Sequence, residues 1–184
     1  MKVLKFGGSS VGSKESILNL KGIVESQSDD VIVVVSALGG ITDRLINTAK
    51  LAAKGDKQYE EELSLMLKRH EQMIRDVIEV KRRRRANKHV RQLFDELSDI
   101  MHGLFLLHDL SEKTLDTIMS YGERLSTQIV VELMDDIKLF DARSFIRTEH
   151  KSPTHAIDSN LTYQLIQDTF KELPHRSLVP GFIS

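Results

Sequence analysis

KFGGSSVG, residues 5–12, stands near the start of the chain and combines three local signals. It completes an apolar run, Val3–Phe6, that is typical of a buried strand. The glycine pair Gly7-Gly8 permits a sharp turn after that strand, and Ser13 is a good N-cap for a following helix. A strand, a turn and a helix N-terminus bring unpaired N–H groups to one spot, where the helix dipole also favours an anion. Because Lys5 lies at the end of the strand, we expect a phosphate-handling site at this turn.

Two better-known phosphate motifs do not match this turn. A P-loop has Lys directly after its last glycine, whereas Gly12 is followed by Ser13 and then Lys14. The dinucleotide fingerprint has alternating glycines, which this stretch lacks. A tight turn between strand and helix with a surface lysine is the structural alternative. The candidate phosphate-binding residues are Lys5, Gly7, Gly8, Ser9 and Ser10.

A second apolar run, Val31–Val35, has no polar position and therefore indicates a central parallel strand covered on both faces. Helices are expected near residues 14–26 and 42–53, so the first part of the chain alternates strands and helices. Ser36 ends the second strand, at the carboxyl edge where α/β sheets bind ligands. Thr42 is expected to cap the helix that follows.

Residues 56–110 change character, with helical periodicity and no strand-like run. Apolar residues recur at helical spacing in two stretches, with a break near Ala86-Asn87. This pattern predicts two long antiparallel helices, which we interpret as an accessory helical lobe inserted in the α/β core. The basic run Lys81–Arg85 is expected to end the first of these helices, where cations complement the dipole. It contains no aromatic residue for stacking, so we do not expect a nucleic-acid site.

The remaining segment returns to alternating elements. Ser111 is expected to cap a long helix. A strand near 138–140, an exposed segment with Ser152-Pro153, a helix at 161–173 and a strand at Leu178–Val179 follow. We therefore predict an α/β fold, a three-layer αβα sandwich with a mostly parallel sheet and an inserted helical hairpin. We expect the sheet to end at the last strand and to leave an unpaired edge there.

Glu123, on the long helix after Ser111, is the candidate for substrate recognition. At about 100° per residue, the apolar stripe of this helix faces the core and places Glu123 at its margin. A carboxylate there can reach a cleft from a rigid helix, and Gly122 beside it allows close approach of ligand or backbone. A solvated glutamate paired with a basic neighbour is the alternative.

The composition excludes several classes of protein. The 184 residues carry a formal net charge of −1, which does not favour nucleic acid or a membrane surface as partner. Cysteine is absent, so a disulfide framework and thiolate chemistry are excluded. No signal-peptide pattern precedes the first strand, and no apolar run reaches the length of a membrane span. We therefore expect a cytoplasmic protein with neither a nucleic-acid nor a membrane partner.

Several motifs match one family in order along the whole chain. Residues 5–11 resemble the KFGG[ST]SV opening of aspartate kinases, and SALGGIT at 36–42 resembles their second signature. SYGERLS at 120–126 resembles their SxGExxS helix, and the segments 141–143 and 180–183 match later landmarks. The chain is therefore identified as similar to the N-terminal part of an aspartokinase catalytic domain, within the amino-acid-kinase superfamily.

The resemblance implies a role for each candidate residue. Lys5 is then catalytic, and together with the Gly7–Ser10 turn it holds the phosphates of ATP, which brings Mg²⁺ with it. The implied substrate-binding residues are Ser36, Thr42 and Glu123, the last through the amino group of L-aspartate. No metal ligand from the protein is expected. Arg143 either binds an anion or anchors its strand through Asp141.

The implied reaction needs little covalent help from the protein. The β-carboxylate of L-aspartate attacks the γ-phosphorus of ATP and gives 4-phospho-L-aspartate and ADP, the first step toward lysine, threonine and methionine. Both reactants are anionic, so the catalyst holds them in line and neutralises charge. No general base is needed, because a carboxylate is already ionised at neutral pH.

The resemblance runs to the end of the chain, where family members continue into a GRGGSD-type loop, the nucleotide half of the site and regulatory domains. We therefore expect a truncated kinase that folds at least in part and is inactive alone, and a homo-oligomer for the full-length protein. A homoserine dehydrogenase module is one continuation that the resemblance allows. The alternatives are a superfamily member acting on glutamate or carbamate, and a non-catalytic helical interaction module on a degenerate kinase core.

Overall fold

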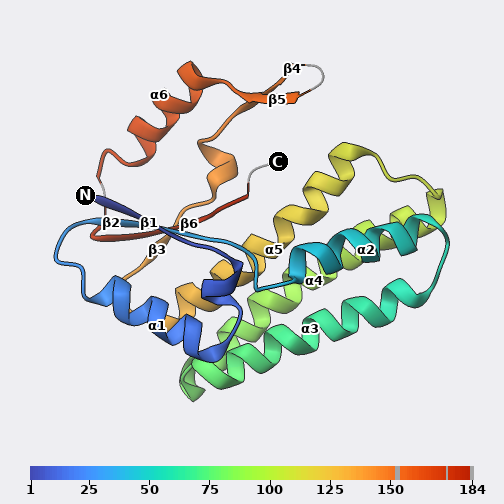
Figure 1. Ribbon diagram of the computed structural model, residues 1–184, viewed down its shortest axis with the longest axis horizontal. Helices are drawn as coiled ribbons and strands as arrows, with labels where there is room; N and C mark the ends of the chain where they lie inside the picture. Colours follow the sequence, from blue (N-terminus) through green and yellow to red (C-terminus); the bar gives the residue numbers. More distant parts are fainter. Residues whose placement is uncertain (152–153, 173, 183–184) are drawn as a thin grey trace.

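A four-stranded parallel sheet orders the molecule, with strand order β1-β2-β6-β3 (Figure 1). The computed structural model describes residues 1–151, 154–172 and 174–182. The strands of this sheet are β1 (Lys2–Phe6), β2 (Val31–Val35), β6 (Arg176–Pro180) and β3 (Lys138–Leu139). All three neighbouring pairs are parallel, so the four carboxyl ends meet at one edge of the sheet.

The last strand of the chain is an interior strand. β6 pairs with β2 on one side and with β3 on the other, so the expectation that the sheet ends at this strand is wrong. The edges are β1 and β3 instead. The reason is burial: Leu178 and Val179 are buried, whereas Val3 of β1 is largely exposed. Apolar strands are stabilised where neighbours cover both faces.

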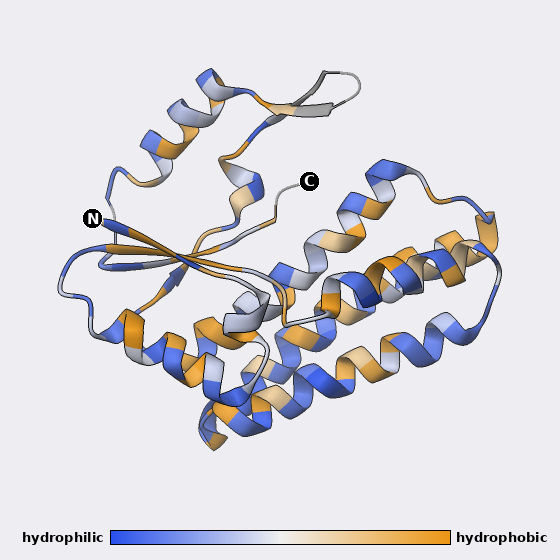
Figure 2. Cartoon of the chain, viewed as in Figure 1, coloured by the Kyte–Doolittle hydropathy of each residue, from blue (hydrophilic) through white to orange (hydrophobic). Residues whose placement is uncertain are grey.

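Helices cover both faces of the sheet, which gives the three layers of the predicted α/β sandwich (Figure 1). One face carries the helices α1 (Lys14–Glu25), α2 (Ile41–Ala53), α3 (Gln58–Val77), α4 (Val80–Leu107) and α5 (Glu112–Leu133). The other face carries α6 (Ser159–Thr169) and a small cluster around Phe145, Val179 and Phe170. The apolar stripes of the helices face inward (Figure 2).

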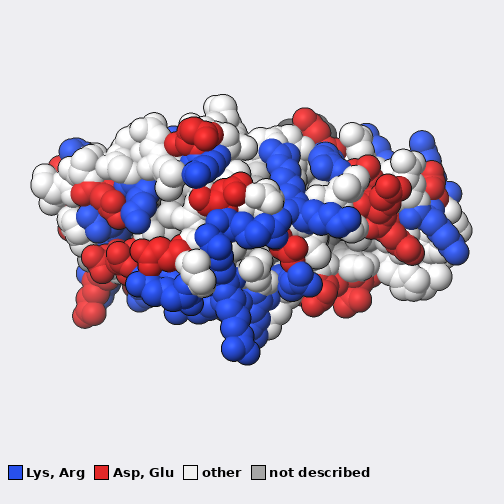
Figure 3. Space-filling model, turned by 90° about the horizontal axis from the view of Figure 1, so that it is seen from below, with Lys and Arg blue, Asp and Glu red and all other residues white. Residues whose placement is uncertain are grey.

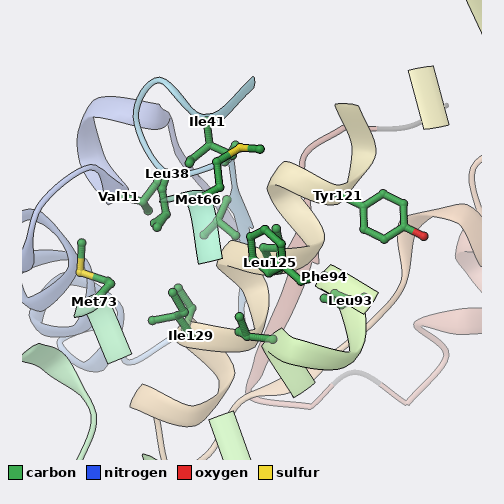
Figure 4. Packing of buried hydrophobic residues seen from close by; sticks show 14 of the residues in the cluster. Val11, Leu38, Ile41, Met66, Met73, Leu93, Phe94, Tyr121, Leu125 and Ile129 are labelled. Carbon is green, nitrogen blue, oxygen red and sulfur yellow. The ribbon is translucent and has the colours of Figure 1, made fainter. Parts of the chain in front are cut away.

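The helical hairpin of α3 and α4 is continuous with the main core. Both helices pack on α2 and α5. Their buried residues, among them Met66, Met73 and Phe94 (Figure 4), belong to the same hydrophobic cluster as the sheet. The break in the hairpin falls at Ile78-Glu79 rather than near Ala86-Asn87. Ile78 turns to an extended conformation at the end of α3, whereas Ala86, a good helix former, is fully buried inside α4.

The basic run Lys81–Arg85 therefore opens a helix, and the expectation that it ends one is wrong. At this position the helix dipole is unfavourable for cations, and contacts with α5 compensate. Arg82 donates to the carbonyls of Glu132 and Met134, which satisfies the C-terminal end of α5. Arg85 forms a two-bonded ion pair with the buried carboxylate of Glu132. Figure 3 views the molecule from below the orientation of Figure 1 and shows basic side chains gathered on that face, with acidic side chains among them.

The smaller elements agree with the sequence-based predictions in part. Ser13 and Ser111 cap α1 and α5 as expected, each accepting a backbone N–H three residues on. A two-stranded antiparallel sheet of β4 (Thr148–Lys151) and β5 (Thr154–Ile157) was not foreseen. Ser152 and Pro153 lie outside the described residues. The helix predicted at 161–173 is α6, which ends at Thr169, so the predicted end is wrong. Two short 3-10 turns, η1 (Gly8–Val11) and η2 (Ala142–Ser144), follow β1 and β3.

Candidate active site at the carboxyl edge of the sheet

Three segments meet beyond the carboxyl ends of β1 and β2: the turn at 7–12, the loop at 36–40 and the middle of α5. The first two are neighbours because β1 and β2 pair in register and the Ser36 N–H donates to the Phe6 carbonyl at 3.0 Å. Val11 of the turn and Leu38 of the loop are buried in the same core cluster, which anchors both segments (Figure 4).

Close backbone contact joins the turn to the loop. A methyl group on Gly12 would lie 3.0 Å from the Gly8 carbonyl oxygen, and one on Gly39 would lie 3.2 Å from the same oxygen. Such distances are shorter than ordinary van der Waals contacts, so a side chain at Gly39 would push the loop away from the turn, and one at Gly12 would distort the turn itself. The glycines in both motifs therefore serve this mutual packing as well as the turns themselves.

The glycine turn is tightly wound and keeps its serine side chains near the surface. η1 starts after an extended Gly7, and the Ser10 N–H bonds the Gly7 carbonyl at 2.8 Å. Ser9 is exposed, and Gly7, Gly8 and Ser10 are half-buried. Ser9 and Ser10 also line a hollow of about 230 Å³ between the turn and α1.

Lys5 lies at the end of β1, as the sequence predicts, with an exposed side chain. Within the part of the chain that the structure describes, its ammonium has no ion-pair partner. An exposed, unpaired lysine beside a glycine turn is able to move onto a bound phosphate.

α5 approaches the 36–40 loop more closely than a side chain would permit. A methyl group on Gly122 would lie 2.7 Å from Cβ of Ala37, so only glycine fits there without displacing the loop. One turn later the buried hydroxyl of Ser126 donates to the Ser36 carbonyl at 2.8 Å. The close approach expected of Gly122 is therefore made by the loop.

Glu123 is more buried than its predicted place at the margin of a stripe. Its side chain faces the interior with only 8 % of the residue exposed, because α5 is covered by the sheet, α2 and α4 together. Burial raises the pKa of the Glu123 carboxyl, and the backbone N–H groups of Ala37 and of Glu123 itself act in the opposite direction. Among the described residues, its Oε2 atom has no hydrogen-bond partner. A buried carboxylate oxygen of this kind is a good acceptor for a cationic ligand.

Ser36 and Thr42 each lie on the segment that the sequence predicts. Ser36 is half-buried and directly precedes Ala37, whose N–H faces Glu123. Thr42 is half-buried in the first turn of α2. It does not cap that helix: Gly40, with φ of 76°, takes the N-cap position. Glycine tolerates this left-handed conformation, which lets the chain turn directly from the loop into α2.

Asp141 and Arg143 form a pair of their own at the end of β3. The Arg143 guanidinium donates to both carboxylate oxygens of Asp141, and this pairing holds the pKa of Asp141 below its usual value. Arg143 and Arg124 also border a hollow of about 140 Å³ beside Pro180. The Arg143 guanidinium is thus paired with Asp141 directly after β3.

Sequence reasoning missed two parts of the site, the backbone N–H of Ala37 and the hydroxyl of Ser126. Ala37 lies in the motif at 36–42 and Ser126 in the motif at 120–126. The sequence carries no signal that these two motifs touch. In the described residues no cluster of three or more His, Asp or Glu side chains is placed to hold a metal. None of the described helices combines the length and apolar character needed to cross a bilayer.

The chain belongs to the amino acid kinase family, whose model matches residues 1–183. Its curated relatives include the aspartokinase of Candida albicans, 32% identical over 141 residues, an alignment that covers 73% of this chain and 26% of that protein. The bifunctional aspartokinase/homoserine dehydrogenase 2 of Escherichia coli is 28% identical over 188 residues, covering 98% of this chain and 22% of that protein. The chain thus spans about a quarter of these relatives' length.

Solved aspartokinases share the fold. E. coli aspartokinase III in complex with lysine and aspartate superposes with a TM-score of 0.81 at 22% identity, covering 97% of this chain and 40% of that one. The same enzyme in complex with aspartate and ADP gives a TM-score of 0.79 at 24% identity, covering 98% and 40%. The predicted α/β amino-acid-kinase fold is confirmed.

Proposed function

We propose that the protein is an aspartate kinase, which transfers the γ-phosphate of ATP to the β-carboxylate of L-aspartate. The observation that carries this proposal is the unpaired, buried Oε2 of Glu123 beside the loop that bears Ser36. An ammonium group of a substrate amino acid would supply the missing partner for this oxygen. The aspartokinase relatives and the complexes of E. coli aspartokinase III with aspartate and ADP support the same choice of substrates.

The chain's own groups divide the work between the two anionic reactants. Glu123 and the Ser36 hydroxyl hold the amino acid, and Thr42 in the first turn of α2 adds a hydroxyl beside a helix N-terminus, which favours a carboxylate. Lys5 and the amides of the Gly7–Ser10 turn receive the phosphates. Mg²⁺, held by the nucleotide's phosphates, would neutralise part of their charge.

Replacing Glu123 by Gln in the full-length protein tests this function. We expect KM for aspartate to rise about 10-fold to 100-fold, because a charge-assisted hydrogen bond to the ammonium is lost, while KM for ATP changes little. Glu132→Gln is the matched control: Glu132 is a buried carboxylate on the same helix, and it pairs with Arg85 far from the loop. Equal effects on both Michaelis constants, or no phosphorylation of aspartate by the unaltered protein, would overturn the proposal.

The same carboxylate predicts how substrate binding depends on pH. Glu123 accepts an ammonium only when ionised, and its pKa is raised by burial. Affinity for aspartate should therefore fall as the pH drops through that raised pKa. The loss should begin at a higher pH than it would if the carboxylate were an exposed glutamate with its usual pKa. The pH profile of KM for aspartate measures this, with Glu123→Gln removing the dependence.

A further inference from the structure

One peptide group of the 36–40 loop is in contact with α5 at both of its ends. The carbonyl of Ser36 and the N–H of Ala37 belong to the same planar peptide, so they point in opposite directions. The carbonyl oxygen accepts from the Ser126 hydroxyl at 2.8 Å. The N–H faces the carboxylate of Glu123. Ser126 thus holds one end of this peptide by a hydrogen bond, and the other end lies on the side of Glu123, the residue three before Ser126 on the same helix.

The Ser126 contact is specific and shielded from water. Ser126 is only 1 % exposed, so solvent cannot replace the bond that its hydroxyl makes. The hydroxyl has a single hydrogen to donate and two carbonyls within reach, that of Ser36 at 2.8 Å and that of Glu123 at 3.0 Å. The shorter contact is the one that leaves the helix and reaches the loop.

The orientation of this peptide decides what Glu123 meets. With the Ala37 N–H toward the carboxylate, the negative charge is partly neutralised from the loop side, and Oε2 is left without a partner. If the peptide rotated, the Ser36 carbonyl oxygen would face the carboxylate instead, and the two acceptors would repel each other.

We propose that Ser126 is a positioning residue: by holding the Ser36 carbonyl, it orients the Ser36–Ala37 peptide and so keeps the Ala37 N–H, rather than a carbonyl oxygen, toward Glu123. Ser126 does not touch substrate in this arrangement, and it acts through Glu123. The expected change in KM for aspartate rests on the proposed aspartate kinase function. The orientation of the peptide does not depend on that function.

Ser126→Ala in the full-length protein should raise KM for aspartate about 5-fold to 10-fold, the effect of losing one buried hydrogen bond, with kcat and KM for ATP changed less than about 2-fold. Thr127→Val is the matched control. Thr127 is the next residue of the helix, is 2 % exposed and donates only to the Arg124 carbonyl within α5. It should leave both Michaelis constants unchanged. An equal rise of KM for aspartate in both variants would overturn the proposal.

A second pair of variants probes the same contact through packing. Gly122→Ala should push the loop away from α5, because its new methyl group would overlap Cβ of Ala37. Combining it with Ala37→Gly moves the methyl from one side of the contact to the other, and should restore KM for aspartate to within about 3-fold. Failure of the double variant to recover, although it folds, would show that loop position does not control substrate binding.

Amide hydrogen exchange at Ala37 gives a readout independent of activity. Exchange at this amide should be at least 10-fold faster in Ser126→Ala than in the unaltered protein, and unchanged in Thr127→Val. If aspartate is not phosphorylated but this pattern holds, the proposed function fails and the positioning role stands. If aspartate is phosphorylated but exchange at Ala37 is the same in all variants, the positioning role is wrong.

Discussion

The carboxyl edge of the sheet and the helical bundle are held together in different ways. At the edge, segments far apart in sequence touch through backbone and glycine, as in the contact of Gly8 with Gly39. In the bundle, α2–α5 are joined by large buried side chains such as Met66, Phe94 and Leu125 (Figure 4). The edge is anchored by a few buried side chains such as Val11 and Leu38, and its local geometry depends on close backbone fit, whereas the bundle supplies most of the large apolar side chains of the core.

This difference separates function from stability. A substitution at the edge should alter activity with little effect on unfolding, and one in the bundle should do the reverse. Glu123 and Ser126 lie on α5, the helix that belongs to both regions, which is how a rigid core presents groups to a loop.

Lys5→Ala should have the largest effect and should be confined to activity. Loss of a cation at the transferring phosphate should lower kcat about 100-fold to 1,000-fold. Because the Lys5 side chain is exposed, the free energy of unfolding should stay within about 0.5 kcal/mol. Steady-state kinetics and urea unfolding on one preparation measure both. A variant with near-normal kcat would remove Lys5 from the catalytic role.

Leu97→Ala tests the other side of the comparison. Leu97 is fully buried in α4, so the cavity left behind should lower the free energy of unfolding by about 2–5 kcal/mol. KM for aspartate should be unchanged in the folded variant. Leu106→Ala, on the same helix but 62 % exposed, is the control and should change stability by less than about 0.5 kcal/mol. A shift of KM in Leu97→Ala would show that the two regions are coupled.

His70 makes the bundle sensitive to acid. Its ring is fully buried, with Nδ1 2.7 Å from the Met66 carbonyl, and burial lowers its pKa from 6.5 to about 4. Between these values the unfolded chain binds a proton that the folded chain does not, so stability is full above about pH 6.5 and falls toward pH 4, by up to about 3 kcal/mol.

His70→Leu should flatten this acid slope, as measured by urea unfolding between pH 7 and pH 4. The same replacement at the exposed His102 should leave the slope in place, because His70 is still present. An unchanged slope in His70→Leu would mean that other groups control acid unfolding.

The smallest effects should distinguish two arginines of the basic run. Arg82→Ala removes donors to the Glu132 and Met134 carbonyls at the end of α5, and should lower the free energy of unfolding by about 1 kcal/mol. Arg84 is exposed and, in the described part of the chain, makes no hydrogen bond or ion pair. Arg84→Ala should therefore change stability by less than about 0.5 kcal/mol. Equal losses in both variants would indicate a general effect of charge.

Much of this protein is determined by local patterns in its sequence. The apolar run at 31–35, the glycine turn after Phe6 and the serine caps at Ser13 and Ser111 predicted elements that the structure confirms. These features act over a few residues, through backbone conformation and helical or strand periodicity, so they can be read without knowledge of distant contacts. They also placed Lys5, Ser36 and Glu123 on the segments where the structure has them.

Only the tertiary structure decided which of these segments touch and which faces are covered. The interior place of β6, the burial of Glu123 and the helix-opening position of the basic run all depend on partners far away in the sequence. The pairing of Ser126 with the Ser36 carbonyl spans 90 residues. Long-range packing selects such contacts by burial and shape, and a short stretch of sequence carries no record of the surface it will meet.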